Sequence, residues 1–364
     1  MTDLPEVMTA AHLVGHGGPE MLVVRHDVPV PEPAAGEVLI RVRACGMNNT
    51  DINTRVGWYS REVTGATPAD GSGQTDGDGT WGGGGLSFPR IQGADPCGEV
   101  VATGLGIGSD ILGRRVLADA WIRDPDDPGD RDRAGYLGSE RDGGFAQFCS
   151  VPAANVHPVD SSFSDVELAS FPCSWSTAEH MLTRSRLRAG ETVVVTGASG
   201  GVGSALVQLA KLRAARVIAV TGAAKVEAVT ALGADAVVDR AVDDLAGAVA
   251  EAAGGPVDVL ADVVGGPAFA PLLEVVRRGG RYTTAGAIAG PMVDLDLRTL
   301  YLNDLEFHGC TVYDPPVFEA LVGHIERGEV RPVVGGTFAL VDICAAQEAF
   351  LAKAHVGALV LTVD

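Results

Sequence analysis

The stretch VVVTGASGGVGSALVQLAK (193–211) most strongly limits what this chain can fold into. An apolar run typical of a buried strand ends in a glycine-rich turn, and apolar residues at helical spacing follow it. Glycine lets a backbone turn tightly and approach a ligand closely, and the first turn of a helix binds phosphate. The segment therefore predicts a strand–turn–helix unit that binds a dinucleotide through Ser199, Gly200, Gly201 and Val202.

The same alternation of strand and helix continues through residues 159–312. Apolar strand patterns recur at 216–222, 236–239, 257–266, 279–287 and 305–313, with helical patterns at 201–214 and 223–234. Such alternation predicts parallel βαβ units in a doubly wound sheet. We therefore expect an α/β protein in which this part is a dinucleotide-binding domain.

Short strands and turns fill the preceding part of the chain. Within 36–48, the apolar residues alternate, which is typical of a strand buried on one face. After residue 312 the pattern predicts a helix (315–330) and a last strand (357–364). We expect residues 1–158 and 313–364 to form one β-rich domain around the domain at 159–312.

Charge and cysteine content narrow the classes of function. The formal net charge is −20, from 47 acidic and 27 basic residues, which argues against nucleic acid and anionic membranes as partners. No signal peptide and no apolar run long enough to span a membrane is visible. The six cysteines are scattered singly, which favours reduced thiols and a cytoplasmic protein.

A glycine-, aspartate- and threonine-rich loop interrupts the first domain at residues 60–87. Its low complexity does not suit a packed element. Loops of this length inside a domain often cover active sites. The loop is either a mobile flap over the active site or a passive surface loop.

Several segments together resemble the medium-chain dehydrogenase/reductase superfamily, close to its zinc-independent, quinone oxidoreductase-like branch. They are RACGMNNTDINTRVGWY (43–59), PRIQGADPCGEVVATG (89–104), DGGFAQFCSVPAANVHPV (142–159), FPCSWSTAEHML (171–182), the segment 190–220, LGADAVVDR (232–240) and HVGALVLTV (355–363). The resemblance covers nearly the whole chain. It implies a GroES-like catalytic domain interrupted by a Rossmann domain, an active site in the cleft between them, and a homodimer formed edge to edge by the Rossmann sheets.

The resemblance also locates the positions that hold catalytic zinc in other members. They are occupied here by Asn48, Ala94 and Cys173. Catalytic zinc needs three protein ligands, and one thiol is not enough. Cys45 and Cys97 lie nearby in sequence, but we expect no rearranged site and no metal. Residues 105–148 also lack the four cysteines of the family's structural zinc lobe.

Without a metal, the candidate catalytic residues are Tyr59, Asn48 and Thr50. Asn48 stands at a vacated ligand position and is suited to donate to a substrate carbonyl. Thr50 matches a proton-relay hydroxyl of the zinc relatives, and Tyr59 matches the tyrosine of the R-x-G-x-Y pattern in quinone oxidoreductases. The alternatives are a rim aromatic for Tyr59 and local turn hydrogen bonding for the other two.

The residues at the end of the second Rossmann strand indicate whether the domain prefers NAD or NADP. An NAD-binding domain places an acidic residue there, whereas this chain has Thr221 followed by Lys225, with Arg240 at the end of the next strand. We expect NADPH, unless these cations are ordinary surface charges. The other expected cofactor-binding residues are Thr177, Val264, Gly286 and Ala287.

These features predict an NADPH-dependent, zinc-independent reductase of an activated C=C bond or a quinone, acting on a small apolar substrate that carries a carbonyl. Two alternatives remain. One is a metal-free NADPH-dependent ketone or aldehyde reductase. The other is a non-catalytic NADPH-binding protein, like the crystallins built on this scaffold.

Overall fold

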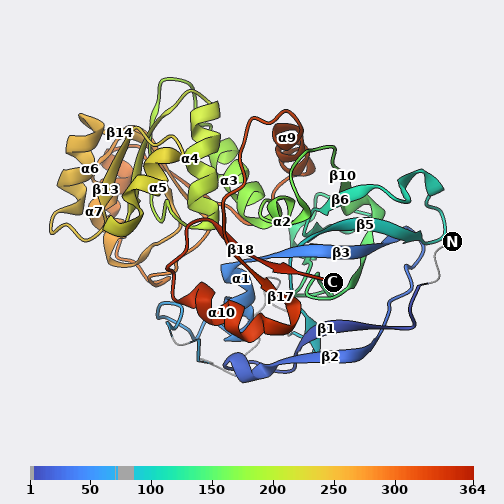
Figure 1. Cartoon of the computed structure of the whole chain (residues 1–364). Coiled ribbons are helices and arrows are strands. Elements are labelled where there is room, and N and C mark those ends of the chain that lie inside the picture. The colour runs from blue at the N-terminus through green and yellow to red at the C-terminus, as the bar shows by residue number, and fades with distance from the viewer. Residues whose placement is uncertain (1–3, 70, 73–85) are drawn as a thin grey trace. The chain divides into compact units, whose positions relative to one another are not determined.

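The computed structural model describes residues 4–69, 71–72 and 86–364. They form two compact units (Figure 1). The first unit contains residues up to Val63, Pro68–Cys173 and Asp314–Asp364, and the second contains Thr64–Thr67 and Ser174–Tyr313. Half of the predicted flap (60–87), namely residues 70 and 73–85, lies outside the described residues, so the flap stays a prediction.

Antiparallel strands build most of the first unit. Its larger sheet has the order β10-β6-β5-β3-β18-β17, with β9 also paired to β3, and a smaller sheet has the order β2-β1-β4. A third pair, β7-β8, stands apart. The strands are β1 (Val7–Leu13), β2 (Leu22–Pro29), β3 (Glu37–Met47), β4 (Arg90–Ile91), β5 (Asp95–Thr103), β6 (Arg115–Ala118), β7 (Trp121–Ile122), β8 (Gly135–Tyr136), β9 (Phe148–Pro152), β10 (Val156–Pro158), β17 (Val334–Ala339) and β18 (Ala358–Thr362).

Strand β3 organises this unit. The predicted inward face (Val38, Ile40, Val42 and Ala44) is buried, but Leu39 is buried as well. At Leu39, β3 pairs with β5 on one edge and with β9 on the other. The last strand, β18, thus pairs with β3 inside the first unit. The helices of this unit are α1 (Asn49–Arg55), α2 (Asp165–Leu168), α9 (Pro315–Glu326) and α10 (Ile343–Leu351).

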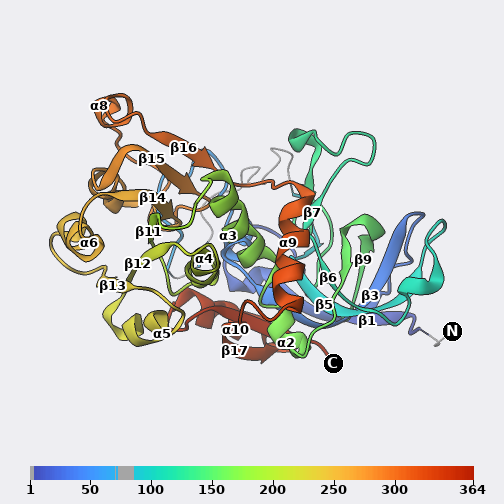
Figure 2. The same ribbon diagram turned by 90° about the horizontal axis from the view of Figure 1, so that it is seen from above.

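The second unit is a parallel sheet with the order β13-β12-β11-β14-β15-β16 (Figure 2). Its strands are β11 (Thr192–Val195), β12 (Arg216–Thr221), β13 (Ala236–Asp239), β14 (Val257–Asp262), β15 (Val276–Thr284) and β16 (Glu306–Gly309). Its helices are α4 (Gly201–Leu212), α5 (Val226–Ala231), α6 (Leu245–Ala253), α7 (Phe269–Leu273) and α8 (Leu297–Leu302), and α3 (Pro172–Arg184) leads into it. The predicted α/β fold with a doubly wound parallel sheet is confirmed.

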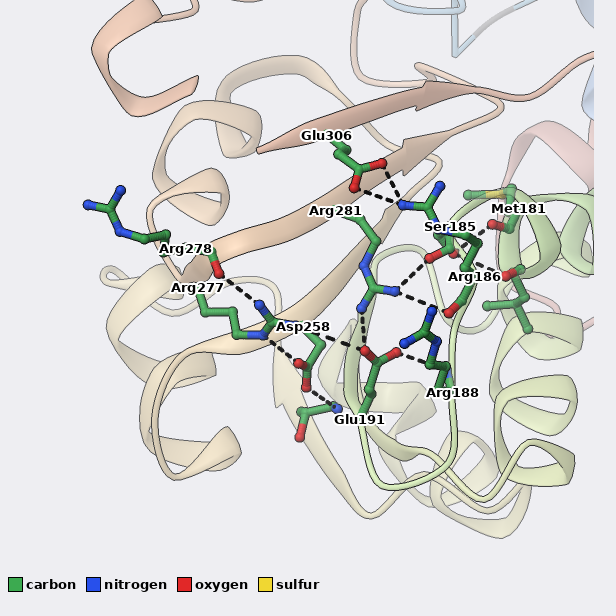
Figure 3. Close-up of polar contacts among 12 residues, drawn as sticks. Met181, Ser185, Arg186, Arg188, Glu191, Asp258, Arg277, Arg278, Arg281 and Glu306 are labelled. Carbon is green, nitrogen blue, oxygen red and sulfur yellow. Dashed lines mark hydrogen bonds and ion pairs between the residues drawn. The ribbon is translucent and has the colours of Figure 1, made fainter. Parts of the chain in front are cut away.

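A buried arginine ties the N-terminal end of this sheet to the segment that precedes it (Figure 3). Arg281 of β15 donates to the carbonyl oxygens of Ser185 and Arg186, at 2.8 and 3.1 Å, and to the Glu191 carboxylate at 2.6 Å. A buried guanidinium needs such partners, because its desolvation is costly. These contacts hold the N-terminal end of the sheet in place. The candidate ligand residues lie at the opposite, C-terminal ends of the strands.

No helix in the described part of the chain is both long enough and apolar enough to cross a membrane.

Candidate functional site

In the first unit, one carboxyl group joins two of the three positions, Asn48 and Cys173, that the family resemblance predicts as vacated zinc-ligand positions. Asp95 is 2% exposed. Its Oδ2 accepts from the Asn48 amide at 2.8 Å, and its Oδ1 accepts from the backbone N–H of Cys173 at 2.9 Å. Asn48 and Cys173 are therefore held by the same side chain, although 125 residues separate them in sequence (173 − 48).

The Cys173 thiol has a partner that the sequence did not suggest. The hydroxyl of Tyr136, in β8, donates to its Sγ at 3.1 Å. Tyr136 is itself held by an edge-to-face contact with Trp121 of β7, with ring centroids 4.7 Å apart. The β7-β8 pair thus brings an aromatic hydroxyl to the last of the three ligand positions.

These residues do not fit a catalytic zinc. The three positions supply an amide bound to a carboxyl group, the methyl group of Ala94 and one thiol. Zinc requires a set of imidazole, thiolate or carboxylate ligands. Across residues 4–69, 71–72 and 86–364, no group of three or more His, Cys, Asp or Glu side chains is placed to hold a metal ion. Burial raises the pKa of the neighbouring Cys45 and Cys97 thiols well above the usual value, which keeps them protonated.

A second buried carboxyl group lies beside the first. Asp51 accepts from the backbone N–H of Asn48 at 2.7 Å, at the start of α1. Burial raises the pKa of Asp51 to about 7 and that of Asp95 to about 8, and the nearby charge of Asp51 adds to the rise for Asp95. Near neutral pH this pair therefore retains protons that exposed carboxylates have lost.

Tyr59 and Thr50 are brought together in the same unit. Burial raises the pKa of the Tyr59 phenol, while hydrogen bonds with the side chains of Thr50 and Asn53 act in the opposite direction. The phenol therefore stays protonated at neutral pH and keeps a proton to donate. The charge of Cys173 also contributes to the rise, so Tyr59 lies within electrostatic reach of the Asp95 group.

In the second unit, the glycine-rich turn between β11 and α4 leaves room for a phosphate. Gly197 has φ of 58°, and a Cβ on Gly203 would lie 2.1 Å from the Gly197 carbonyl oxygen, so both positions require glycine. At Gly200, by contrast, a Cβ would meet its nearest neighbour at 3.5 Å. Ser199 to Val202 lie at the first turn of the 12-residue helix α4, whose N-cap is a glycine and supplies no capping side chain. This turn fits the pyrophosphate of a dinucleotide.

Two cations lie together beyond the end of β12. The pKa of Lys225 is lowered by burial and by the positive charge of Arg240. The backbone N–H of Arg240 donates to the Thr221 carbonyl at 2.8 Å, which fixes the two strand ends together. A bound anion near both cations would relieve their repulsion.

The remaining predicted cofactor residues lie on three further segments of the second unit. Val264 follows β14, and its carbonyl accepts from Ala289 at 2.9 Å. Gly286 and Ala287 follow β15, while Thr177 is half-buried on α3. The turns after β11, β12, β14 and β15 all lie at the C-terminal edge of the sheet, the edge at which α/β proteins bind ligands.

Sequence reasoning missed Asp95 and Tyr136. Asp95 was visible only as the neighbour of a missing histidine, and its partners lie far away in sequence. For Tyr136 there was no signal, because a two-stranded pair inside a polar loop has no readable pattern.

Comparisons with known protein families match both units. The model of the alcohol dehydrogenase GroES-like domain matches residues 34–161, and that of the zinc-binding dehydrogenases matches residues 201–327. The crystal structure of a "putative alcohol dehydrogenase" from Sinorhizobium meliloti 1021 is 49% identical, with a TM-score of 0.90, over 100% of this chain and 99% of that one.

Two curated relatives match along nearly their whole lengths. An acryloyl-coenzyme A reductase from Metallosphaera sedula is 29% identical over 92% of this chain and 95% of its own. A quinone oxidoreductase from Rattus norvegicus is 26% identical over 94% of both chains. With both domains matched in order and a solved relative 49% identical throughout, the chain belongs to the quinone oxidoreductase-like branch of the medium-chain dehydrogenase/reductase superfamily, a superfamily of nicotinamide-dependent oxidoreductases.

Proposed function

We propose that this protein uses NADPH to reduce the activated carbon–carbon double bond of a small apolar carbonyl compound, or a quinone, without a catalytic zinc. The observation that carries the proposal is the Asp95 carboxyl group, which binds Asn48 and Cys173 where relatives hold a metal. The names of the two curated relatives, an acryloyl-coenzyme A reductase and a quinone oxidoreductase, support the same substrate class.

The donor groups of the first unit suit this reaction. Interconversion of an alcohol and its carbonyl compound concentrates charge on one oxygen, which a zinc ion stabilises well. Addition of hydride to a conjugated double bond spreads the charge towards the carbonyl, where hydrogen-bond donors serve. In this proposal the Asn48 amide orients the carbonyl oxygen, and Asp95 fixes the direction of that amide.

Tyr59 is the proposed proton donor. Its phenol is kept protonated by burial, and Thr50 and Asn53 hold its hydroxyl through their side chains. Transfer of that proton to the substrate leaves a phenolate that takes a proton back from solvent, with Thr50 as the relay. The second unit is proposed to hold NADPH, which supplies the hydride when bound, with its pyrophosphate at Gly200 and Gly201 and its 2′-phosphate between Lys225 and Arg240.

A homodimer and a cytoplasmic location complete the proposal. Strand β16 is an edge strand, and apolar side chains are exposed on it and on the segment before it. They are Met292, Val293, Leu297, Tyr301, Leu302 and Phe307, and we name them the edge patch. Figure 2 shows α8 beside the β15–β16 end of the sheet. All six cysteines lie in the described part of the chain and none forms a disulfide, which suits a reducing compartment.

A substrate panel tests the reaction. We expect NADPH oxidation with enones or quinones, unchanged by chelators, and well under one zinc per chain by metal analysis. Turnover of ketones and aldehydes alone would favour the alcohol dehydrogenase-like alternative. Tight NADPH binding without turnover of any substrate would favour the non-catalytic alternative, and stoichiometric zinc with chelator-sensitive turnover would refute zinc independence.

Replacing Tyr59 with Phe tests the proton donor. We expect kcat to fall by roughly 10- to 1,000-fold, because general-acid groups contribute on this order. The Kd for NADPH should stay within about twofold, because the proposed cofactor residues lie in the second unit and Tyr59 lies in the first. If kcat is unchanged, Tyr59 only packs at the rim and the proton comes from elsewhere.

Replacing Lys225 with Ala tests cofactor choice. A hydrogen bond between charged groups contributes about 1.5–3 kcal/mol, so we expect the KM for NADPH to rise about 10- to 100-fold while the KM for NADH barely changes. Lys211→Ala is the matched control, because Lys211 lies in the same unit and pairs with Asp235 at 2.8 Å. Equal use of NADPH and NADH by the unmodified protein would contradict the assignment.

Sedimentation analysis tests the homodimer. We expect a mass near 74.8 kDa, twice the 37.4 kDa of one chain, for the unmodified protein. The double substitution Leu297→Glu with Tyr301→Glu should give a folded monomer, because it places charges in the edge patch. The control, Leu105→Glu, alters a leucine of the first unit that is even more exposed than Leu297, and it should leave the dimer intact. A monomeric unmodified protein would overturn the proposal.

A further inference from the structure

The carboxyl group of Asp262 lies at the C-terminal end of β14, 2% exposed. Its Oδ1 accepts from the Thr196 hydroxyl at 2.5 Å, and its Oδ2 accepts from the Tyr282 hydroxyl at 3.0 Å. Thr196 directly follows β11, and Tyr282 lies in β15. One carboxyl group therefore binds side chains from the segments on both sides of its own strand.

The same carboxyl group shapes the turn that follows β14. It accepts from the backbone N–H of Val264 at 2.9 Å and from that of Gly265 at 3.2 Å. The Thr196 hydroxyl oxygen accepts from the N–H of Val263 at 3.1 Å. All three successive N–H groups of this turn thus end on the Asp262–Thr196 pair. Charge-assisted bonds of this kind are the stronger ones in proteins.

This turn also touches the neighbouring candidate cofactor segments. A Cβ on Gly197 of the glycine-rich turn would lie 3.1 Å from a methyl group of Val263. On the other side, the Val264 carbonyl accepts from Ala289 at 2.9 Å, and Gly266 donates to Gly290 at 3.2 Å. The loop 286–290 carries Gly286 and Ala287. A shift of the turn would therefore move the loop 286–290, to which two hydrogen bonds tie it.

The order of the strands indicates which part of a dinucleotide this turn faces. In a doubly wound sheet the pyrophosphate lies at the first strand, and the adenosine half extends over the second. Here these strands are β11 and β12, and Lys225 and Arg240 follow the ends of β12 and β13. On the other side of β11 lie β14 and β15. The nicotinamide half of the dinucleotide consequently extends towards the turn after β14.

We propose that Asp262 is a positioning residue for the nicotinamide half of the cofactor, acting through the turn Val263–Gly266. It touches neither substrate nor reacting atoms in this role. The inference rests on the proposed NADPH-dependent function. Its distinctive consequence is that loss of the carboxylate weakens binding of the whole dinucleotide but not of its adenosine half.

The experiment compares two ligands on two asparagine variants. The ligands are NADPH and adenosine 2′,5′-bisphosphate, which is the adenosine half alone, and Kd is measured for each by titration calorimetry. The variants are Asp262→Asn and the matched control Asp258→Asn at the opposite end of the same strand. Asp258 accepts from Thr192 at 2.8 Å and from Arg277 at 2.6 Å, far from the C-terminal edge (Figure 3).

We expect Asp262→Asn to raise the Kd for NADPH at least about tenfold, because an amide has one acceptor oxygen and cannot accept all the hydrogen bonds that the carboxyl group accepts. Its Kd for adenosine 2′,5′-bisphosphate should stay within about twofold, and Asp258→Asn should change neither. Tyr282→Phe removes one donor and keeps the carboxylate. It should weaken NADPH binding by a few fold with the fragment unaffected, and it decides the question if Asp262→Asn does not fold.

Three results would overturn the inference. If the unmodified protein binds neither ligand, the proposed function fails and takes this role with it. If the unmodified protein binds both but the Asp262 and Tyr282 variants behave like Asp258→Asn, only the positioning role fails. If both ligands weaken equally, Asp262 supports the whole unit rather than the nicotinamide half.

Discussion

The hydrogen bonds of the Asp95 carboxyl group hold the candidate catalytic residues in place. They connect the start of α1, through Asn48, with the start of α3, through Cys173, while Asp95 itself begins the central strand β5. A buried carboxyl group must find such donors, because an unsatisfied one is expensive in an apolar interior. Meeting that demand fixes the amide of Asn48, and the helix that starts there leads to Tyr59.

The sequence allows the fold to be predicted because its strongest signals are local. The turn at Gly197–Gly203 depends on neighbouring residues, and the alternation of strands and helices repeats every few tens of residues. The sequence led us to expect that residues 313–364 rejoin the first domain, but it did not indicate a partner strand. The pairing of β18 with Cys45 and Gly46 of β3 is visible only in the structure.

The candidate site could be predicted only where its residues follow a local motif or consecutive strands of the sheet. Lys225 and Arg240 follow consecutive strand ends, so their proximity could be inferred from βαβ geometry. The bonds from Asp95 to residues 48 and 173, and from Tyr136 to Cys173, join segments that only the folded structure brings together. Asp262 had one readable signal, an acidic residue at the end of a strand, but Asp258 near the start of the same strand is acidic too.

The two buried acids at Asn48 make protons part of the native structure. Burial raises the pKa of Asp51 to about 7 and that of Asp95 to about 8, above the value of about 4 for an exposed carboxyl group in the unfolded chain. Between these values the folded chain binds more protons than the unfolded one, so the free energy of unfolding decreases as the pH rises through this window. The two protons at this site therefore contribute to the stability of the fold at acidic and neutral pH, and that contribution is lost as the pH rises through about 8.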